Sequence, residues 1–366
     1  MHPCLSFSRA LAVTLIGLIA TGLFLGCKGN SSSSETKRII ILINGESPYW
    51  DACRVGVGEA EKDFKLADAK LKAVVESNDN TPQGQLEKLR QFASQSDIVA
   101  IGISPCDAAN VAVADEMRNL KNRGIHVITI DSDVDRSKLR ECRFAFVGTD
   151  NLAAGRELGK CLKGFRPEGG GYITFVGRKG AQNAMDRIQG VGEGAGDKWK
   201  PLDCMGDDVD RNVARENVRN AISNHKQNLN ALIGIWSYNA PAIVDVVKKD
   251  AEARKDHLVV TFDAEPLAIA GMSEGMIDAM VVQNPYEMGY QGVRLMHALI
   301  RKDEATVKQM LPNEGKPDGD LYDTGLKVVV PDGDARLKAD MFDKKTQFMP
   351  FSKFREWMAK YNLSGS

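Results

Sequence analysis

Five residues that can hydrogen-bond to a small molecule stand where apolar runs of the sequence end. They are one alcohol, two carboxylates and two amides: Ser104, Asp131, Asn239, Asp263 and Gln283. The runs before them are typical of strands buried on both faces of a parallel sheet. A single residue of this kind more often begins a turn or caps the next helix. Together, however, the five offer the donors and acceptors that a polyhydroxylated ligand requires.

Two adjacent aromatic residues, Tyr49 and Trp50, follow the first apolar run at residues 38–43. Ligands of open α/β sheets bind beyond the carboxyl ends of the strands, so this pair is expected where a ligand lies. Aromatic rings also pack well against the C–H faces of such molecules. The other interpretation, in which the pair packs onto its own helix, stays open on this strand alone.

Strand-like and helix-like segments alternate strictly along the chain. The first half predicts strands and helices in turn at residues 38–43, 51–66, 70–77, 82–94, 97–103, 108–123 and 125–130. The alternation begins again with a strand at residues 144–148 and a helix at 152–163. Further strands are predicted at 172–176, 231–236, 258–262 and 279–282. Such alternation predicts parallel sheets with right-handed crossovers, so the fold class is α/β with two doubly wound, Rossmann-like lobes.

Composition limits the functions that the chain can have. Its 366 residues, 43% of them hydrophobic, suffice for two domains, and a formal net charge of −1 provides no basic field for nucleic acid. The sequence has no phosphate-binding loop, no Gly-x-Ser-x-Gly elbow and no His-Glu-x-x-His helix, and the glycine run at 192–196 lies in a helical region. We therefore expect no cofactor, no metal and no enzymatic activity, although carboxylates that could act as a general base are plentiful.

The N-terminus has the pattern of an export signal. Arg9 precedes an apolar run at residues 10–26, and Cys27 follows. The Gly-Cys end resembles a bacterial lipoprotein signal, so residues 1–26 are predicted to be removed and Cys27 to be lipidated. Secretion with cleavage elsewhere is the alternative. The serine-rich segment 27–37 is predicted to be a flexible tether.

Five cysteines follow Cys27, and their spacing fits neither a disulfide framework nor a zinc site. They are Cys53, Cys106, Cys142, Cys161 and Cys204. One pair could be oxidised outside the cytoplasm, either Cys142 with Cys161 or Cys53 with Cys106. Buried free thiols are the default expectation for the others.

From about residue 37 to residue 330 the chain resembles the periplasmic sugar-binding proteins of the ribose type, which are type 1 periplasmic binding proteins and the soluble receptors of ABC importers. The segments that carry the resemblance recur in order and at compatible spacing: 45–50, 103–107, 127–131, 147–151, 186–190, 236–239, 260–263 and 282–289.

The resemblance implies a set of ligand-binding residues. Tyr49 and Trp50 would stack on the sugar, while the polar contacts would come from Ser104, Asp131, Arg187, Asn239, Asp263 and Gln283. Two positions depart from the ribose pattern: Ser132 stands where that receptor has an arginine, and Val209 replaces an aromatic residue. The ligand expected is a monosaccharide or similar polyol, with another pentose, a hexose or a cyclitol all open.

The resemblance also implies two lobes that close around the ligand through a three-crossing hinge near 149–150, 283–284 and 311–312. The predicted lobes are residues 38–149 plus 285–312 and residues 150–284 plus 313–366. The chain would act as a monomeric, membrane-anchored receptor in the periplasm or at the cell surface and would deliver the sugar to an ABC permease. Output to a sensor kinase and a sugar-modifying enzyme are the alternatives, whereas the export signal argues against a transcriptional regulator.

Overall fold

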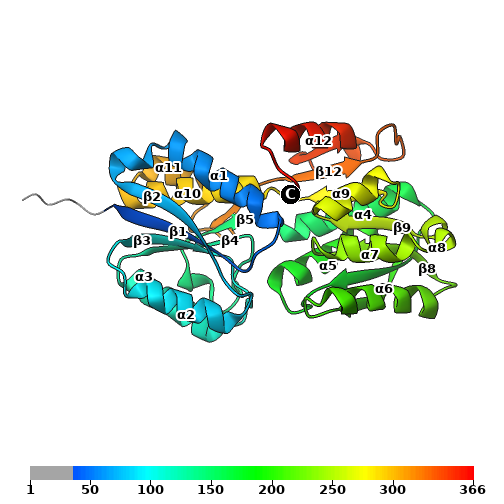
Figure 1. Ribbon diagram of the computed structural model, residues 1–366, viewed down its shortest axis with the longest axis horizontal. Helices are drawn as coiled ribbons and strands as arrows, with labels where there is room; N and C mark the ends of the chain where they lie inside the picture. The colour runs from blue at the N-terminus through cyan, green and yellow to red at the C-terminus, as the bar shows by residue number, and fades with distance from the viewer. Residues whose placement is uncertain (1–35) are drawn as a thin grey trace, which may run out of the picture. The chain divides into compact units, whose positions relative to one another are not determined.

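The computed structural model describes residues 36–366, which contain two β-sheets with helices on both faces of each (Figure 1). The predicted signal peptide, Cys27 and nearly all of the predicted tether lie outside the described residues. Within residues 36–366, none of the helices combines the length and the apolar character needed to span a bilayer.

The first sheet is entirely parallel, in the order β11-β5-β4-β3-β1-β2. Its strands are β1 (Lys37–Ile43), β2 (Leu71–Ser77), β3 (Ile98–Ile103), β4 (His126–Ile130), β5 (Phe146–Gly148) and β11 (Leu321–Asp323). Its helices are α1 (Tyr49–Asp63), α2 (Pro82–Ala93), α3 (Val111–Asn122), α10 (Pro285–Arg301) and α11 (Glu304–Met310), with short 3-10 turns at Leu66–Ala69 and Arg140–Cys142. Alternate residues of β1 point to opposite faces: Ile39 and Ile41 pack in the core with α1 and α10, whereas Ile40 and Leu42 pack in the core with α2 and α3.

The second sheet has the order β13-β12-β10-β9-β8-β6-β7, and within it only the β10–β12 pair is antiparallel. Its strands are β6 (Gly170–Val176), β7 (Trp199–Gly206), β8 (Leu229–Gly234), β9 (Leu258–Phe262), β10 (Ala279–Val282), β12 (Leu326–Val330) and β13 (Thr346–Pro350). Its helices are α4 (Asn151–Phe165), α5 (Gln182–Ala195), α6 (Arg211–Asn224), α7 (Asn239–Val247), α8 (Ala251–Asp256), α9 (Pro266–Ser273) and α12 (Phe351–Lys360), with a 3-10 turn at Ala339–Met341.

The chain passes between the two sheets three times. Two passages, from β5 to α4 and from β10 to α10, lie where the sequence predicts them. The third follows β11 rather than Leu311-Pro312, because β11 pairs with β5 in the first sheet before β12 joins the second. Asp320, just before β11, forms ion pairs with Arg140 and Arg143 of the first lobe. Residues 320–323 thus belong with the first sheet, although the sequence-based division assigns them to the second lobe.

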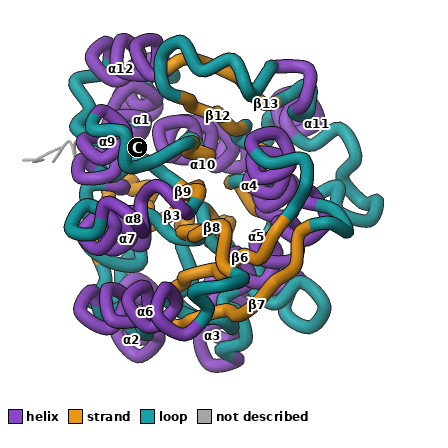
Figure 2. Tube along the Cα trace, turned by 90° about the vertical axis from the view of Figure 1, so that its right-hand side faces the viewer, coloured by secondary structure: helices purple, strands orange, loops and turns teal. Residues whose placement is uncertain are grey.

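The C-terminal tail belongs to the second sheet. β13 extends this sheet as a parallel edge strand beside β12. In the ribbon diagram α12 lies next to β12 (Figure 1), and both are in the upper part of the tube in Figure 2. Phe351, Phe354 and Met358 of α12 are buried in the core that also contains α6, α7 and α9. Beyond α12, the Ser366 amide donates to the Ala264 carbonyl, beside the carboxyl end of β9.

All five cysteines of residues 36–366 are free, so neither candidate disulfide pair is bonded. Cys53, Cys142 and Cys161 are buried, and burial raises the pKa of Cys53 to about 12 and that of Cys142 to about 11. A thiol shielded in this way is poorly reactive, because the thiolate is the form that reacts.

Candidate functional site

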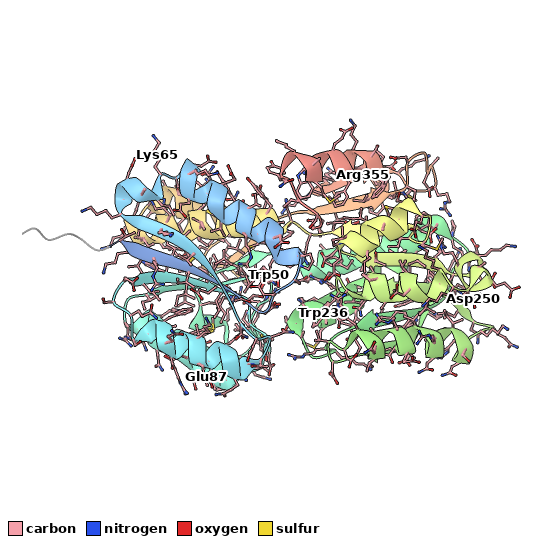
Figure 3. All side chains as sticks on the ribbon, viewed as in Figure 1. Trp50, Lys65, Glu87, Trp236, Asp250 and Arg355 are labelled. Atoms are coloured by element: carbon pink, nitrogen blue, oxygen red, sulfur yellow. The ribbon has the colours of Figure 1, made fainter. Side chains whose placement is uncertain are left out.

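A cavity of about 290 Å³ lies between the carboxyl ends of the strands of the two sheets. In each sheet the strand order reverses direction beside its first strand, at β3-β1-β2 and at β8-β6-β7, and such a reversal opens a crevice where ligands bind. Loops after β1 to β4 line the cavity from one side, and loops after β6 to β10 line it from the other. Figure 3 shows Trp50 and Trp236 at the facing edges of the two sheets.

The aromatic pair predicted from the sequence lines this cavity. α1 begins at Tyr49, and the Tyr49 and Trp50 rings meet edge to face with centroids 5.0 Å apart. Tyr49 Oη donates to Asp131 Oδ1 at 2.7 Å, and Trp50 Nε1 donates to Asn44 Oδ1 at 3.1 Å. Because the protein already uses both donors, the rings are held in place and present their apolar faces to a ligand.

Asp131 and Asp263 occupy equivalent places in the two sheets. Each directly follows a strand, β4 or β9, and each is buried with a left-handed backbone, at φ 60° and φ 64° respectively. Such a backbone is uncommon outside glycine and often marks a functional site. Burial raises the pKa of Asp131 and raises that of Asp263 to about 7. Asp263 Oδ1 is buried without a hydrogen-bond partner, so one acceptor is available to a ligand.

Arg187 lies close to both carboxylates and lowers the pKa of each. It reaches this place because α4 and α5 pack very closely: a Cβ at Gly155 would overlap the Arg187 carbonyl oxygen. The buried guanidinium donates to Asn151 Oδ1 at 2.9 Å and to the Ile235 carbonyl at 3.1 Å. It also lies 3.8 Å from the centre of the Phe262 ring. On α5, a Cβ at Gly190 or Gly194 would overlap the carbonyl oxygen of Leu152 or Arg156 in α4, so these two glycines serve the same helix packing.

Gln283 joins the site to the hinge. Its Oε1 accepts from Thr149 Oγ1 at 2.9 Å and from Arg187 Nη2 at 3.3 Å, and its Nε2 donates to Asp263 Oδ2 at 3.2 Å. Thr149 and Gln283 lie on two of the passages between the sheets. A change in the hinge is therefore coupled directly to the polar groups of the cavity.

Two of the residues expected at the ligand, Ser104 and Asn239, lie behind the cavity wall. Ser104 is buried and its Oγ donates to Asp131 Oδ2 at 3.1 Å. Asn239 Nδ2 donates to Asp207 Oδ2 at 2.9 Å, and its Oδ1 accepts from the Trp236 amide at 3.0 Å. Neither lines the cavity, whereas Tyr49, Trp50, Asp131, Arg187, Asp263 and Gln283 all do.

Several lining residues were not predicted. They are chiefly Arg178, Asn183, Arg211, Trp236 and Glu265. Asn183 Nδ2 donates across the cleft to Ser132 Oγ at 3.2 Å, while its Oδ1 is buried without a partner. All five follow a strand end of the second sheet closely, so the rule that identified Asp131 and Asp263 could have found them too.

The backbone of the second lobe is strained where it borders the cavity. Val209, which lines the cavity, has φ 71°, a conformation that a β-branched side chain rarely adopts. Its amide donates to Asp207 Oδ1 at 2.9 Å, and Asp207 is itself buried and bonded to Tyr238 and Asn239. This network holds the strained loop in place.

Among residues 36–366, no group of His, Cys, Asp or Glu side chains is arranged to hold a metal ion. The fold and the cavity together define a two-lobed binding protein with its site in the interlobe cleft. The model of the periplasmic binding protein domain matches residues 39–304, and the chain belongs to this family.

Curated relatives and solved structures agree with this assignment. The D-allose-binding periplasmic protein of Escherichia coli (strain K12) is 24% identical over 321 residues, which cover 86% of this chain and 96% of the relative. The ribose import binding protein of Bacillus subtilis (strain 168) is 23% identical over 263 residues, 71% of this chain and 81% of that protein. A solute-binding protein from Burkholderia graminis C4D1M, solved with D-arabinose, has a TM-score of 0.69 at 24% identity and covers 81% of this chain and 96% of its own.

The predicted fold class and the resemblance to type 1 periplasmic binding proteins are therefore confirmed. Family membership also places the chain among binding proteins rather than enzymes, with an extracytoplasmic location.

Proposed function

We propose that this protein captures a monosaccharide or similar polyol between its lobes and delivers it to an ABC transporter. The observation that carries the proposal is the convergence of Asp131 from one sheet with Arg187 and Asp263 from the other on a single cavity, beside two fixed aromatic rings. The sugar assignment is supported by two relatives, one named for binding D-allose and one for ribose import.

In the proposed complex, Tyr49 and Trp50 pack against the C–H faces of the sugar. Asp131, Asp263, Arg187 and Gln283 hydrogen-bond to its hydroxyls. Buried polar groups of this kind discriminate strongly, because an analogue that lacks one hydroxyl leaves its partner unsatisfied. Ser104 and Asn239 support these contacts indirectly: Ser104 orients Asp131, and Asn239 fixes the loop that carries Trp236.

Ligand capture is proposed to stabilise the closed arrangement of the lobes. A ligand that touches both lobes adds interaction free energy only when they are together, and this shifts the equilibrium toward closure. Two contacts already cross the cleft, from Asn183 to Ser132 and from Arg136 to Asp186, whose charged atoms are 4.0 Å apart. The closed form would then dock on the permease.

The receptor is further proposed to be a monomer anchored through a lipid on Cys27, with residues 27–37 as the tether. Anchoring would keep it close to the permease. A Cys27→Ser variant of the full-length precursor should appear in the soluble fraction, whereas the unchanged protein should sediment with membranes. Equal sedimentation of the two would refute the anchor without affecting the sugar assignment.

A thermal-shift screen over monosaccharides and polyols tests the sugar assignment. A ligand at a hundred times its Kd stabilises the native state by about 2.7 kcal/mol, which should raise Tm by several degrees. Asp263→Asn should lose the response, whereas Lys179→Gln, which changes an exposed residue outside the cavity, should keep it. If amino acids or peptides shift Tm and no sugar or polyol does, the proposal is wrong.

A further inference from the structure

Arg178 lines the cavity with a charge that the protein leaves unpaired. It is half-buried and follows the end of β6. Within residues 36–366 its guanidinium has neither an ion-pair partner nor a hydrogen-bond acceptor. The other lining arginines differ: Arg187 has three acceptors, and Arg211 lies 3.4 Å from Glu265 and over the Tyr238 ring.

The Trp236 ring lies beside the backbone that carries Arg178, and Trp236 also lines the cavity. The six-membered ring faces this backbone: a Cβ at Gly177 would lie 2.2 Å from Trp236 Cζ3 and 2.7 Å from Tyr238 Oη. The indole therefore offers an apolar surface next to Arg178, and the guanidinium is the donor that lacks an acceptor there. A ligand group that can accept hydrogen bonds from it would satisfy this donor.

The charge of Arg178 acts at a different end of the cavity from the two aspartates. Burial raises the pKa of Cys106 to about 11, and the Arg178 charge opposes that rise; it opposes the rise in the pKa of Tyr238 in the same way. For Asp131 and Asp263, the cation that lowers the pKa is Arg187. Arg178 therefore acts on the side of the cavity near Cys106 and Tyr238, whereas Arg187 serves the two aspartates.

From this arrangement we infer that the ligand is an acidic monosaccharide, a uronic or aldonic acid, whose carboxylate faces Arg178. The inference rests on the proposed function, since it places the sugar hydroxyls at Asp131, Asp263 and Gln283. A planar carboxylate matches the fork of a guanidinium. One unpaired cation suits one negative charge, whereas a sugar phosphate would bring about two charges into a cavity already lined by Glu46, Asp131, Asp133, Asp263 and Glu265.

The test compares each acid with its neutral counterpart by titration of tryptophan fluorescence, since Trp50 and Trp236 both line the cavity. Suitable pairs are galacturonate with galactose, glucuronate with glucose, and gluconate with glucitol. In the unchanged protein, the acid of at least one pair should bind about ten- to a hundredfold more tightly than its partner, as a charge-assisted hydrogen bond implies. Added salt should weaken binding of the acid only.

Two variants that each remove one positive charge separate the contact of Arg178 with the ligand from the general effect of that charge on binding. Arg178→Gln should remove the preference for the acid and leave the affinity for the neutral sugar within about twofold of its original value. Lys179→Gln should keep the preference, because Lys179 is exposed and does not line the cavity. Equal Tm values for both variants and the parent would show that folding is unaffected.

The possible failures are distinguishable. If neutral sugars bind at least as tightly as the acids, or if Arg178→Gln weakens both members of a pair equally, the inference is wrong and the proposed function stands. Tighter binding of galactose 6-phosphate than of galacturonate would also overturn the carboxylate assignment. If neither acids nor neutral sugars bind, the proposed function itself fails.

Discussion

Replacing Arg187 with methionine should destabilise the protein by an amount that grows with pH. Arg187 is fully buried between two carboxylates and makes three hydrogen bonds, and methionine replaces its guanidinium over the Phe262 ring with an apolar side chain. Removing one partner of a buried charge cluster usually costs about 3–5 kcal/mol, because the remaining charges are left uncompensated. Here the remaining charges are those of Asp131 and Asp263, which can be neutralised by protonation.

The direction of the pH effect follows from the two aspartates. The pKa of Asp263 rises from 3.8 to about 7 on folding, and that of Asp131 also rises. A carboxyl group whose pKa is higher in the folded state destabilises the fold progressively as the pH rises from the unfolded value toward the folded one. Arg187 lowers both folded pKa values. Without it they rise further, so the loss of stability caused by the substitution deepens as the pH rises past the folded pKa of Asp263, about 7.

Urea unfolding followed by tryptophan fluorescence would measure this effect. We expect Arg187→Met to lower the free energy of unfolding by about 1–2 kcal/mol near pH 5, where Asp263 is protonated and mainly hydrogen bonds are lost. Near pH 8 the loss should reach about 3–5 kcal/mol. Arg219→Met, which removes an exposed arginine from an ion pair with Glu216, should change stability by less than about 1 kcal/mol at both pH values. A loss for Arg187→Met that is independent of pH, or larger near pH 5, would refute the reasoning.

Three further substitutions test other parts of the structure. Phe354→Ala in α12 should lower the free energy of unfolding by about 3–5 kcal/mol, because this ring is fully buried in the second-sheet core; a loss below about 1 kcal/mol would show that the tail is dispensable. Asn239→Ala should cost about 1–3 kcal/mol of stability by leaving Asp207 and the Trp236 amide short of a partner, and unchanged urea unfolding would contradict this. Arg136→Gln removes a partly buried ion pair across the cleft and also an ion pair with buried Asp133, which keeps Arg143. Stability should therefore fall by about 1–3 kcal/mol while ligand affinity falls a few-fold; calorimetry showing unchanged affinity would rule out a role for the cleft contact in closure.

Local pattern alone predicted most of the fold. The aliphatic runs of β1, β3, β4, β8 and β9 identify buried parallel strands, because a strand covered on both faces must be apolar along its whole length. The same reasoning placed Asp131 and Asp263 at strand ends. β11 was not predicted, since three half-buried residues carry no periodicity, and its assignment to the first sheet depends on pairing with β5, far away in the sequence.

The sequence by itself determined which residues reach the carboxyl edges of the sheets, because that depends only on where strands end. It could not determine which of them meet a ligand. Asn239 and Arg178 both follow strand ends, yet Asp207 binds the first and no residue in the described part of the chain binds the second. Only the tertiary structure decides this, because whether a polar group is satisfied depends on atoms that the fold brings to within about 3 Å of it.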